Sequence, residues 1–132
     1  WKRLKTLKLS DNNFSVTVTP AASQFFIALS GLQHVRRIHL RGCHLAKLFG
    51  LALATGLSNI STLRVIDLSS NPNLGDEGIK DILHALKQCK DMSEVYLDNC
   101  GLTAASMPYI TAALHTWPKL GGLSLVNNNF SE

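Results

Sequence analysis

Five copies of one nine-residue pattern divide this chain at an almost constant spacing. The pattern is L-x-x-L-x-L-x-x-[N/C], where L is an apolar residue, and its copies start at Leu4, Val35, Leu63, Met92 and Leu120. The spacings are 31, 28, 29 and 28 residues. All fifteen L positions are apolar although apolar residues make up 45% of the chain, so chance does not account for the pattern. Such a repeat predicts a solenoid, in which each turn of chain buries its apolar edge against its neighbours.

The period and the pattern together predict a leucine-rich repeat solenoid with an α/β fold. The second and third L positions, such as Leu7 and Leu9, lie two residues apart, which places both side chains on one face of a strand. We therefore expect parallel strands on a concave face and helices on a convex face. Residues 1–132 are expected to form a single domain of about four and a half repeats. Neither end has a polar capping repeat, so we expect a fragment of a longer solenoid.

The second half of each repeat has the apolar spacing of an amphipathic helix. In the third repeat Asp76 and Glu77 stand at the expected helix start, where acids complement the helix dipole. Thr103 is a predicted N-cap, and Thr19 and Pro20 are a predicted cap and first helical residue. The three extra residues of the first repeat are expected to lengthen the loop before its helix. The side chains expected in the core are Phe25, Leu29, Phe49, Leu53, Leu57, Ile79, Ile82, Leu83, Leu86, Ile110, Leu114, Trp1 and Trp117.

The last position of the pattern, which we call the ladder position, alternates between asparagine and cysteine. It runs Asn12, Cys43, Asn71, Cys100 and Asn128. There the chain leaves the strand and turns inside the solenoid, so a side-chain amide can bond backbone groups that would otherwise be buried without partners. Cysteine is a small apolar substitute with a weak S–H donor. Cys43 and Cys100 are expected roughly 10 Å apart, beyond disulfide reach.

This alternation, with one helix per repeat of 28 or 29 residues, resembles the ribonuclease-inhibitor-like subfamily of leucine-rich repeats. The subfamily includes ribonuclease inhibitor, the sensor regions of NOD-like receptors, Ran GTPase-activating protein and the CARMIL actin regulators. The resemblance covers essentially the whole chain and implies a horseshoe that binds other proteins. No single residue selects one member, and the 31-residue first repeat departs from the pattern of ribonuclease inhibitor itself.

The net charge of +4 hides an uneven distribution along the chain. Residues 1–66 hold nine Lys and Arg against one acid, Asp11, whereas residues 67–132 hold four Lys against eight acids. A solenoid keeps sequence order in space, so one end is expected to be basic and the other weakly acidic. The basic end makes nucleic-acid or other polyanion binding an alternative function. Few exposed aromatics for base stacking and the acidic second half count against nucleic acid.

Three unpaired thiols in structural positions indicate a reducing compartment, and we expect a cytoplasmic location. Three N-x-[S/T] triplets, at Asn13, Asn59 and Asn129, are the opposing signal. No apolar run is long enough to span a membrane. The His and Cys residues have no metal-site spacing, no phosphate-binding glycine loop occurs, and Cys43 is expected to point inward. We therefore predict no enzyme, no metal and no cofactor.

The outward-facing strand positions are varied where the inward ones are uniform, which is typical of a recognition surface. The candidate partner-binding residues are Lys8, Arg37, His39, Arg41, Asp67, Glu94, Tyr96 and Asp98. Lys8 and the Arg and His residues are expected to form a basic cluster, and the acids around Tyr96 a separate acidic one. Arg and Tyr are favoured interface anchors.

The predicted function is a non-enzymatic protein-interaction scaffold, part of a larger cytosolic regulator or sensor, that binds its partner through the concave face. Five strands offer roughly 340 Å² of face, against about 800 Å² per partner in a standard interface. The chain is therefore expected to hold only part of a binding site. A GTPase-activating role is an alternative that the subfamily resemblance alone implies. Self-association through the uncapped ends is a further possibility.

Overall fold

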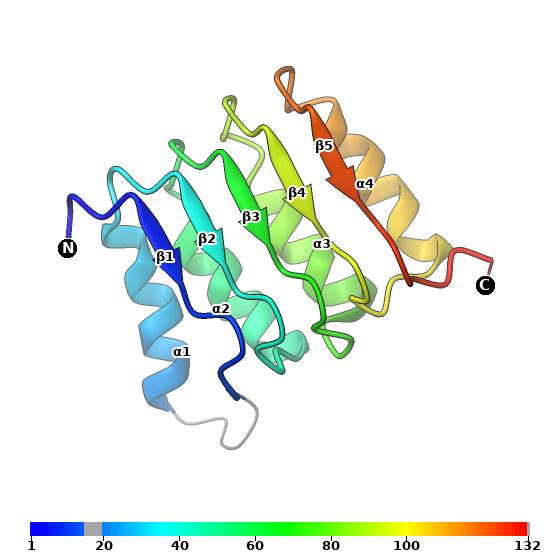
Figure 1. The fold of residues 1–132 in the computed structure, drawn as a ribbon, viewed down its shortest axis with the longest axis horizontal. Coiled ribbons are helices and arrows are strands. Elements are labelled where there is room, and N and C mark those ends of the chain that lie inside the picture. Colours follow the sequence, from blue (N-terminus) through cyan, green and yellow to red (C-terminus); the bar gives the residue numbers. More distant parts are fainter. Residues whose placement is uncertain (15–19, 132) are drawn as a thin grey trace.

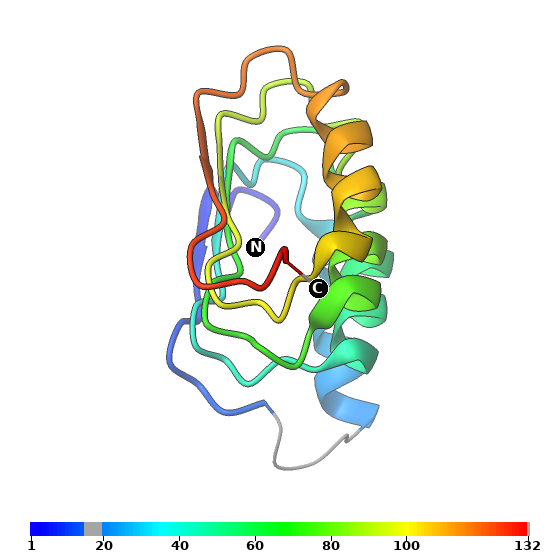
Figure 2. The ribbon, with the colours of Figure 1, turned by 90° about the vertical axis from the view of Figure 1, so that its right-hand side faces the viewer.

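The computed structural model describes residues 1–14 and 20–131 of the chain. Figure 1 shows the strands side by side in chain order in front of the helices, and Figure 2 shows the two layers edge-on. The strands are β1 (Thr6–Lys8), β2 (Arg37–His39), β3 (Val65–Asp67), β4 (Glu94–Tyr96) and β5 (Gly122–Ser124). The helices are α1 (Pro20–Ile27), α2 (Lys47–Leu57), α3 (Gly75–Ala85) and α4 (Met107–Leu114), with 3-10 turns at Ala28–Gly31 and Ala104–Ser106. This arrangement confirms the predicted α/β leucine-rich repeat solenoid.

The five strands form one parallel sheet in the order β1-β2-β3-β4-β5. Thr6 pairs with Arg37, and the same row continues through Val65, Glu94 and Gly122. This is the register that the alignment of the five repeats predicts. The middle residues of the strands, which face the helix layer, are Leu7, Ile38, Ile66, Val95 and Leu123. The first and third residue of each strand therefore lie on the opposite side, which we call the strand face.

The apolar side chains between the layers form one continuous buried cluster. It contains the predicted core residues of α2 and α3, among them Phe49, Leu53, Ile79 and Ile82. Asp76 and Glu77 occupy the first turn of α3, and the Thr103 hydroxyl accepts a hydrogen bond from the Ala105 amide, as expected for an N-cap. Thr19 and the loop before α1 lie outside the described residues.

Three expected core positions differ from the structure. Trp117 is buried and its indole N–H donates to the Leu86 carbonyl, whereas Trp1, in the equivalent position before the first pattern, is 56% exposed. Leu114 is 39% exposed, and Ala113 is buried in its place. Phe25 is only half-buried. The neighbouring Phe26, which is completely buried, is the core residue of α1.

The ladder position forms one interior file, as predicted. The Asn71 side-chain oxygen accepts hydrogen bonds from the amides of Cys43 and Leu45, both at 3.0 Å. Its amide nitrogen donates to the carbonyls of Leu40 and Leu68. Asn128 makes the equivalent bonds one pair of repeats further on, to Cys100, Leu102, Leu97 and Leu125.

The cysteine repeats use a different connection to the turn before them. The thiols of Cys43 and Cys100 donate to the carbonyls of Leu9 and Leu68. Their backbone carbonyls accept from Phe14 and Gly75 in the preceding repeat. The residue that follows each ladder cysteine, His44 or Gly101, has a positive φ of 56° or 70°. Asparagine and cysteine repeats therefore alternate in backbone conformation as well as in sequence.

A second left-handed position recurs in all five repeats, directly before the ladder residue. It is occupied by Asp11, Gly42, Ser70, Asn99 and Asn127, whose φ angles lie between 49° and 65°. Glycine, asparagine and aspartate adopt this conformation at least cost. The turn that follows each strand is thus built by residue types that the consensus pattern does not specify.

Candidate functional site

The strand face carries all eight of the predicted partner-binding residues. Lys8 pairs in the same row with His39, Asp67 and Tyr96, and Arg37 pairs with Val65 next to Glu94. Arg41 and Asp98 lie two residues beyond their strands, at the same level of the sheet. The side chains of Lys8, Arg37, Arg41 and Glu94 are exposed, whereas those of His39, Asp67, Tyr96 and Asp98 are half-buried.

The predicted separation of a basic from an acidic cluster is wrong at one point. Nη1 of Arg41 lies 3.9 Å from Oδ2 of Asp67, so the two clusters meet in an ion pair between neighbouring strands. The Arg41 side chain is half exposed, and such a pair contributes little to stability. Ser69, two residues after Asp67, is completely buried, and its hydroxyl accepts a hydrogen bond from the Asp98 amide.

Two of the acids also accept hydrogen bonds at the ends of strands, Asp67 in its own repeat and Asp98 in the next repeat. Oδ1 of Asp67 accepts the Ser69 amide at 2.9 Å, and Oδ1 of Asp98 accepts the Val126 amide at 2.8 Å. The same Asp98 oxygen accepts the Ser124 hydroxyl. Asp67 and Asp98 therefore have structural duties that sequence reasoning did not assign.

Tyr96 and Glu94 act as a pair on the next strand. The Tyr96 hydroxyl donates to Oε2 of Glu94 at 2.9 Å. This bond and the adjacent carboxylate raise the pKa of the Tyr96 phenol, since they stabilise its protonated form. The pair offers a partner a neutral aromatic ring beside a carboxylate.

A basic cleft lies at the edge of the strand face where the strands begin. It has a volume of about 540 Å³ and is lined by Lys5, Thr6, Arg36, Arg37, His39, Arg64, Val65, Ser93 and Glu94. Sequence reasoning included Arg37, His39 and Glu94 but missed Lys5, Arg36 and Arg64. The missed residues each directly precede a strand, so the alternation of strand positions did not place them on the face.

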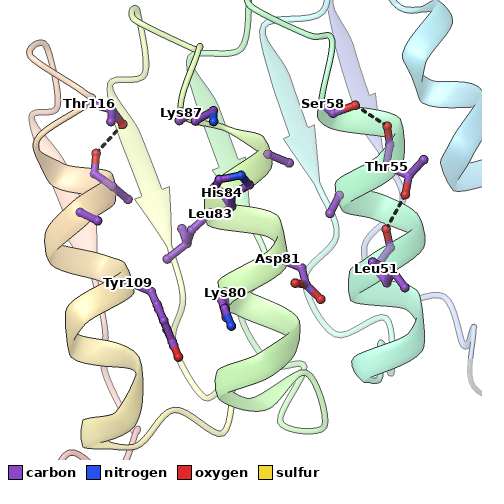
Figure 3. A pocket seen from close by; sticks show the side chains of 14 residues that line it. Leu51, Thr55, Ser58, Lys80, Asp81, Leu83, His84, Lys87, Tyr109 and Thr116 are labelled. Atoms are coloured by element: carbon purple, nitrogen blue, oxygen red, sulfur yellow. Dashed lines mark hydrogen bonds between the residues drawn. The ribbon is translucent and has the colours of Figure 1, made fainter.

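A second hollow lies on the opposite side, between α2, α3 and α4. Figure 3 shows this groove, which has a volume of about 670 Å³. Small residues such as Ala54, Ala85 and Ala113 line it where the helices adjoin. The Lys80 ammonium lies 5.1 Å from the centre of the Tyr109 ring, which is within cation–π range. Sequence reasoning missed this groove.

The three thiols are poorly suited to nucleophilic chemistry. Cys43, Cys89 and Cys100 are completely buried and unpaired. Burial raises the pKa of all three, to about 11 for Cys89 and about 12 for Cys100. A reactive cysteine needs a lowered pKa and access to solvent. Over residues 1–14 and 20–131 no three His, Cys, Asp or Glu side chains gather closely enough to hold a metal ion.

Comparison with known proteins agrees with this architecture. Family profiles described as leucine-rich repeat match residues 3–25 and 59–83. The ribonuclease inhibitor of Sus scrofa is 32% identical over 112 residues, which are 80% of this chain. The NACHT, LRR and PYD domains-containing protein 12 of Mus musculus is 34% identical over 137 aligned residues, which cover 99% of this chain.

The chain belongs to the ribonuclease-inhibitor-like leucine-rich repeat family. The Homo sapiens NACHT, LRR and PYD domains-containing protein 5 is a further relative, 33% identical over 99 residues. This leucine-rich repeat chain spans only a small part of these relatives, namely 24% of the ribonuclease inhibitor and 12% and 8% of the two NACHT proteins. None of the helices in the part of the chain that the structure describes is long and apolar enough for a membrane crossing.

Proposed function

We propose that this leucine-rich repeat chain is a non-enzymatic protein-interaction module that binds its partner through the strand face. The observation that carries the proposal is the contrast between the two sides of the sheet. The residues of β2, β3 and β4 that face the helices are uniformly apolar and buried. The residues of these strands that lie on the strand face vary in charge, size and polarity. The strand face is thus the surface whose residues can differ without cost to the core.

The family relationship supports a protein as the partner. Ribonuclease inhibitor, one of the relatives, is by its name a protein that acts on another protein. Arg37 and Tyr96 supply the residue types that most often anchor protein interfaces. The buried, high-pKa thiols argue against a catalytic role, and three unpaired cysteines favour a reducing compartment such as the cytosol.

The strand face of this chain is expected to form one part of a binding site in a larger regulator or sensor. Five strands at about 4.8 Å spacing offer roughly 340 Å² of face, which is less than half of the about 800 Å² per partner in a standard interface. This size agrees with the small share of each relative that the chain covers. We propose that residues 1–132 act as a single domain within such a site.

The test is an affinity comparison with an identified partner. Proteins captured on the immobilised chain are identified by mass spectrometry, produced in pure form, and titrated by calorimetry. R37A and Y96A should each weaken binding about tenfold, because a truncated anchor costs about 1–2 kcal/mol. L48A and L51A, which change exposed side chains of α2, should leave the affinity within twofold. The strand-face assignment is wrong if the α2 variants abolish binding and the strand-face variants do not.

A further inference from the structure

Three basic residues form a file along the edge of the sheet where the strands begin. The Arg36 amide donates to the Lys5 carbonyl and the Arg64 amide donates to the Arg36 carbonyl, both at 2.8 Å. The three residues are therefore backbone neighbours directly before β1, β2 and β3, whose starts lie along the upper edge of the sheet in Figure 1. At about 4.8 Å per strand, the file from Lys5 to Arg64 spans roughly 10 Å.

The side chains of this file share one cleft with two more basic residues. Arg37 and His39 also line it, and the charged side chains of Lys5, Arg36, Arg37 and Arg64 are all exposed. The two ion pairs among residues 1–14 and 20–131 join other side chains, Arg41 to Asp67 and Lys119 to Asp91. Like charges on adjacent strands destabilise a sheet. The cleft therefore concentrates positive charge that no ion pair of the described residues neutralises, and its one lining acid, Glu94, lies at the far end.

At the end of the cleft toward β4, the basic side chains give way to a neutral and an acidic residue. On the next strand the file continues to Ser93, whose amide donates to the Arg64 carbonyl at 2.7 Å, and the exposed carboxylate of Glu94 lies beside it. Positive charge is thus limited to three strands and is followed at once by a negative group. A ligand that fills the cleft needs a short run of negative charge and then a cationic or amide group.

We propose that this cleft binds the carboxylates of a short acidic segment of a protein partner, a step that rests on the proposed function of the strand face. In an extended peptide, side chains two residues apart point the same way and lie about 6.5–7 Å apart. Two such carboxylates span most of the file of Lys5, Arg36 and Arg64. Arginine binds carboxylates through paired N–H donors, which suits it to this role.

Charge and shape favour a peptide over a nucleic acid. A phosphate backbone carries a regular, uninterrupted series of negative charges. Glu94 would repel such a backbone as it left the third strand. Single-stranded nucleic acids also rely on aromatic platforms for stacking. The neighbouring aromatic residue, Tyr96, is tied to the Glu94 carboxylate by its hydroxyl.

The experiment uses the whole chain and three fluorescent probes. The first is the peptide Glu-Ser-Glu-Ser-Glu-Lys, the second is its charge-reversed counterpart with Lys for Glu, and the third is an oligothymidylate with as many phosphates as the first has glutamates. Binding is measured by anisotropy at low and at physiological salt. We expect the acidic peptide to bind best of the three and to weaken as salt rises.

Two double variants test where the peptide binds. R36A/R64A removes two charges from the cleft, and K47A/K87A removes two exposed charges from the helix side. The loss of two exposed arginines should weaken the acidic peptide about tenfold in R36A/R64A, whereas K47A/K87A should weaken it less than twofold. Circular dichroism checks that both variants fold. If R36A/R64A does not fold, R36Q/R64Q replaces it.

Three results would overturn the cleft assignment. They are equal weakening in both double variants, no weakening in R36A/R64A, and tighter binding of the oligothymidylate than of the acidic peptide. Failure of the cleft differs from failure of the strand face as a whole, because Arg41 and Tyr96 lie outside the cleft lining. If R41A and Y96A still weaken the identified partner, only the cleft assignment is lost. If they do not, but the peptide results hold, the strand-face proposal is the one that fails.

Discussion

The side-chain oxygen of Asn71 accepts a hydrogen bond from the backbone amide of Cys43, 28 residues earlier, at 3.0 Å. It also accepts the Leu45 amide, and its own amide group donates to the Leu40 carbonyl of that turn. Asn71 is completely buried, so water cannot replace these bonds. One side chain therefore satisfies the backbone of the preceding repeat at three points.

Replacing Asn71 by alanine should be among the most damaging single changes in the chain. It leaves buried amides of Cys43 and Leu45 without partners, and each such group costs about 1–3 kcal/mol. We expect the free energy of unfolding to fall by about 3–5 kcal/mol in urea titrations. Asn12→Ala is the matched control, since Asn12 holds the same position in the first repeat but is exposed. It should cost about 1 kcal/mol or less.

Gly56→Ala should separate two helices. A Cβ atom at Gly56 in α2 would lie 1.9 Å from the Phe26 carbonyl oxygen of α1, and that backbone atom can move only with its helix. Overpacking of this kind costs about 1–3 kcal/mol or more, which thermal unfolding should report as a lowered Tm. At Gly121 the nearest atom to an added Cβ is 3.9 Å away, so Gly121→Ala should leave the Tm nearly unchanged.

Stability should decline as the solution becomes alkaline. In the folded chain burial raises the pKa of Cys89 to about 11 and that of Cys100 to about 12, from an ordinary value of 9.0. Above pH 9 the unfolded chain therefore loses these protons first, which favours unfolding. Each thiol should lower the free energy of unfolding by about 1.4 kcal/mol per pH unit, from pH 9 up to its folded pKa.

Urea titrations at pH 8 and pH 10 measure this decline. Lysines and tyrosines also titrate in the alkaline range, so the informative quantity is the difference between the wild type and a Cys89→Ala/Cys100→Ala variant. The variant should be less stable at pH 8 but lose less stability on going to pH 10. Equal losses in the two proteins would contradict the assignment to the thiols.

Residues of the strand face should differ in how much they contribute to the stability of the fold. Oδ1 of Asp98 holds the Val126 amide and the Ser124 hydroxyl, so Asp98→Ala should cost about 1–2 kcal/mol. Lys8 is exposed and takes part in neither ion pair of the described residues, so Lys8→Ala should change stability by less than about 0.5 kcal/mol. Chemical denaturation of both variants checks this difference. Equal costs would show that the turn does not depend on the Asp98 carboxylate.

The fold was predictable because the repeat pattern encodes it five times. Each L position has one role, and the core prediction was wrong at the first position of the chain and where a helix changed its phase. The Trp117 indole donates to the Leu86 carbonyl in the repeat before it, whereas Trp1 packs its ring against the edge of Phe25 and stays largely exposed. The fourth helical segment opens with a 3-10 turn at Ala104–Ser106, and the buried side after Ile110 then continues at Ala113 instead of Leu114.

The candidate site was only partly predictable, for a different physical reason. Alternation along a strand correctly placed residues such as Lys8 and Arg37 on the strand face. It did not predict the bonds of Asp67 and Asp98, because these join the carboxylates to backbone amides beyond the strands, at Ser69 and Val126. It also missed Lys5, Arg36 and Arg64, since the face extends one residue ahead of each strand into the basic cleft.

The two kinds of ladder junction mean that the repeats are not interchangeable units. After a cysteine repeat, the ladder asparagine of the next turn accepts a hydrogen bond from the backbone of that cysteine. After an asparagine repeat, the backbone carbonyl of the next ladder cysteine accepts a hydrogen bond from the preceding turn. Deleting one repeat would bring two turns of the same kind together and leave the wrong groups facing each other. Deleting two consecutive repeats would preserve every pairing. Insertion or deletion of repeats in this solenoid is therefore tolerated best when one asparagine repeat and one cysteine repeat are added or removed together.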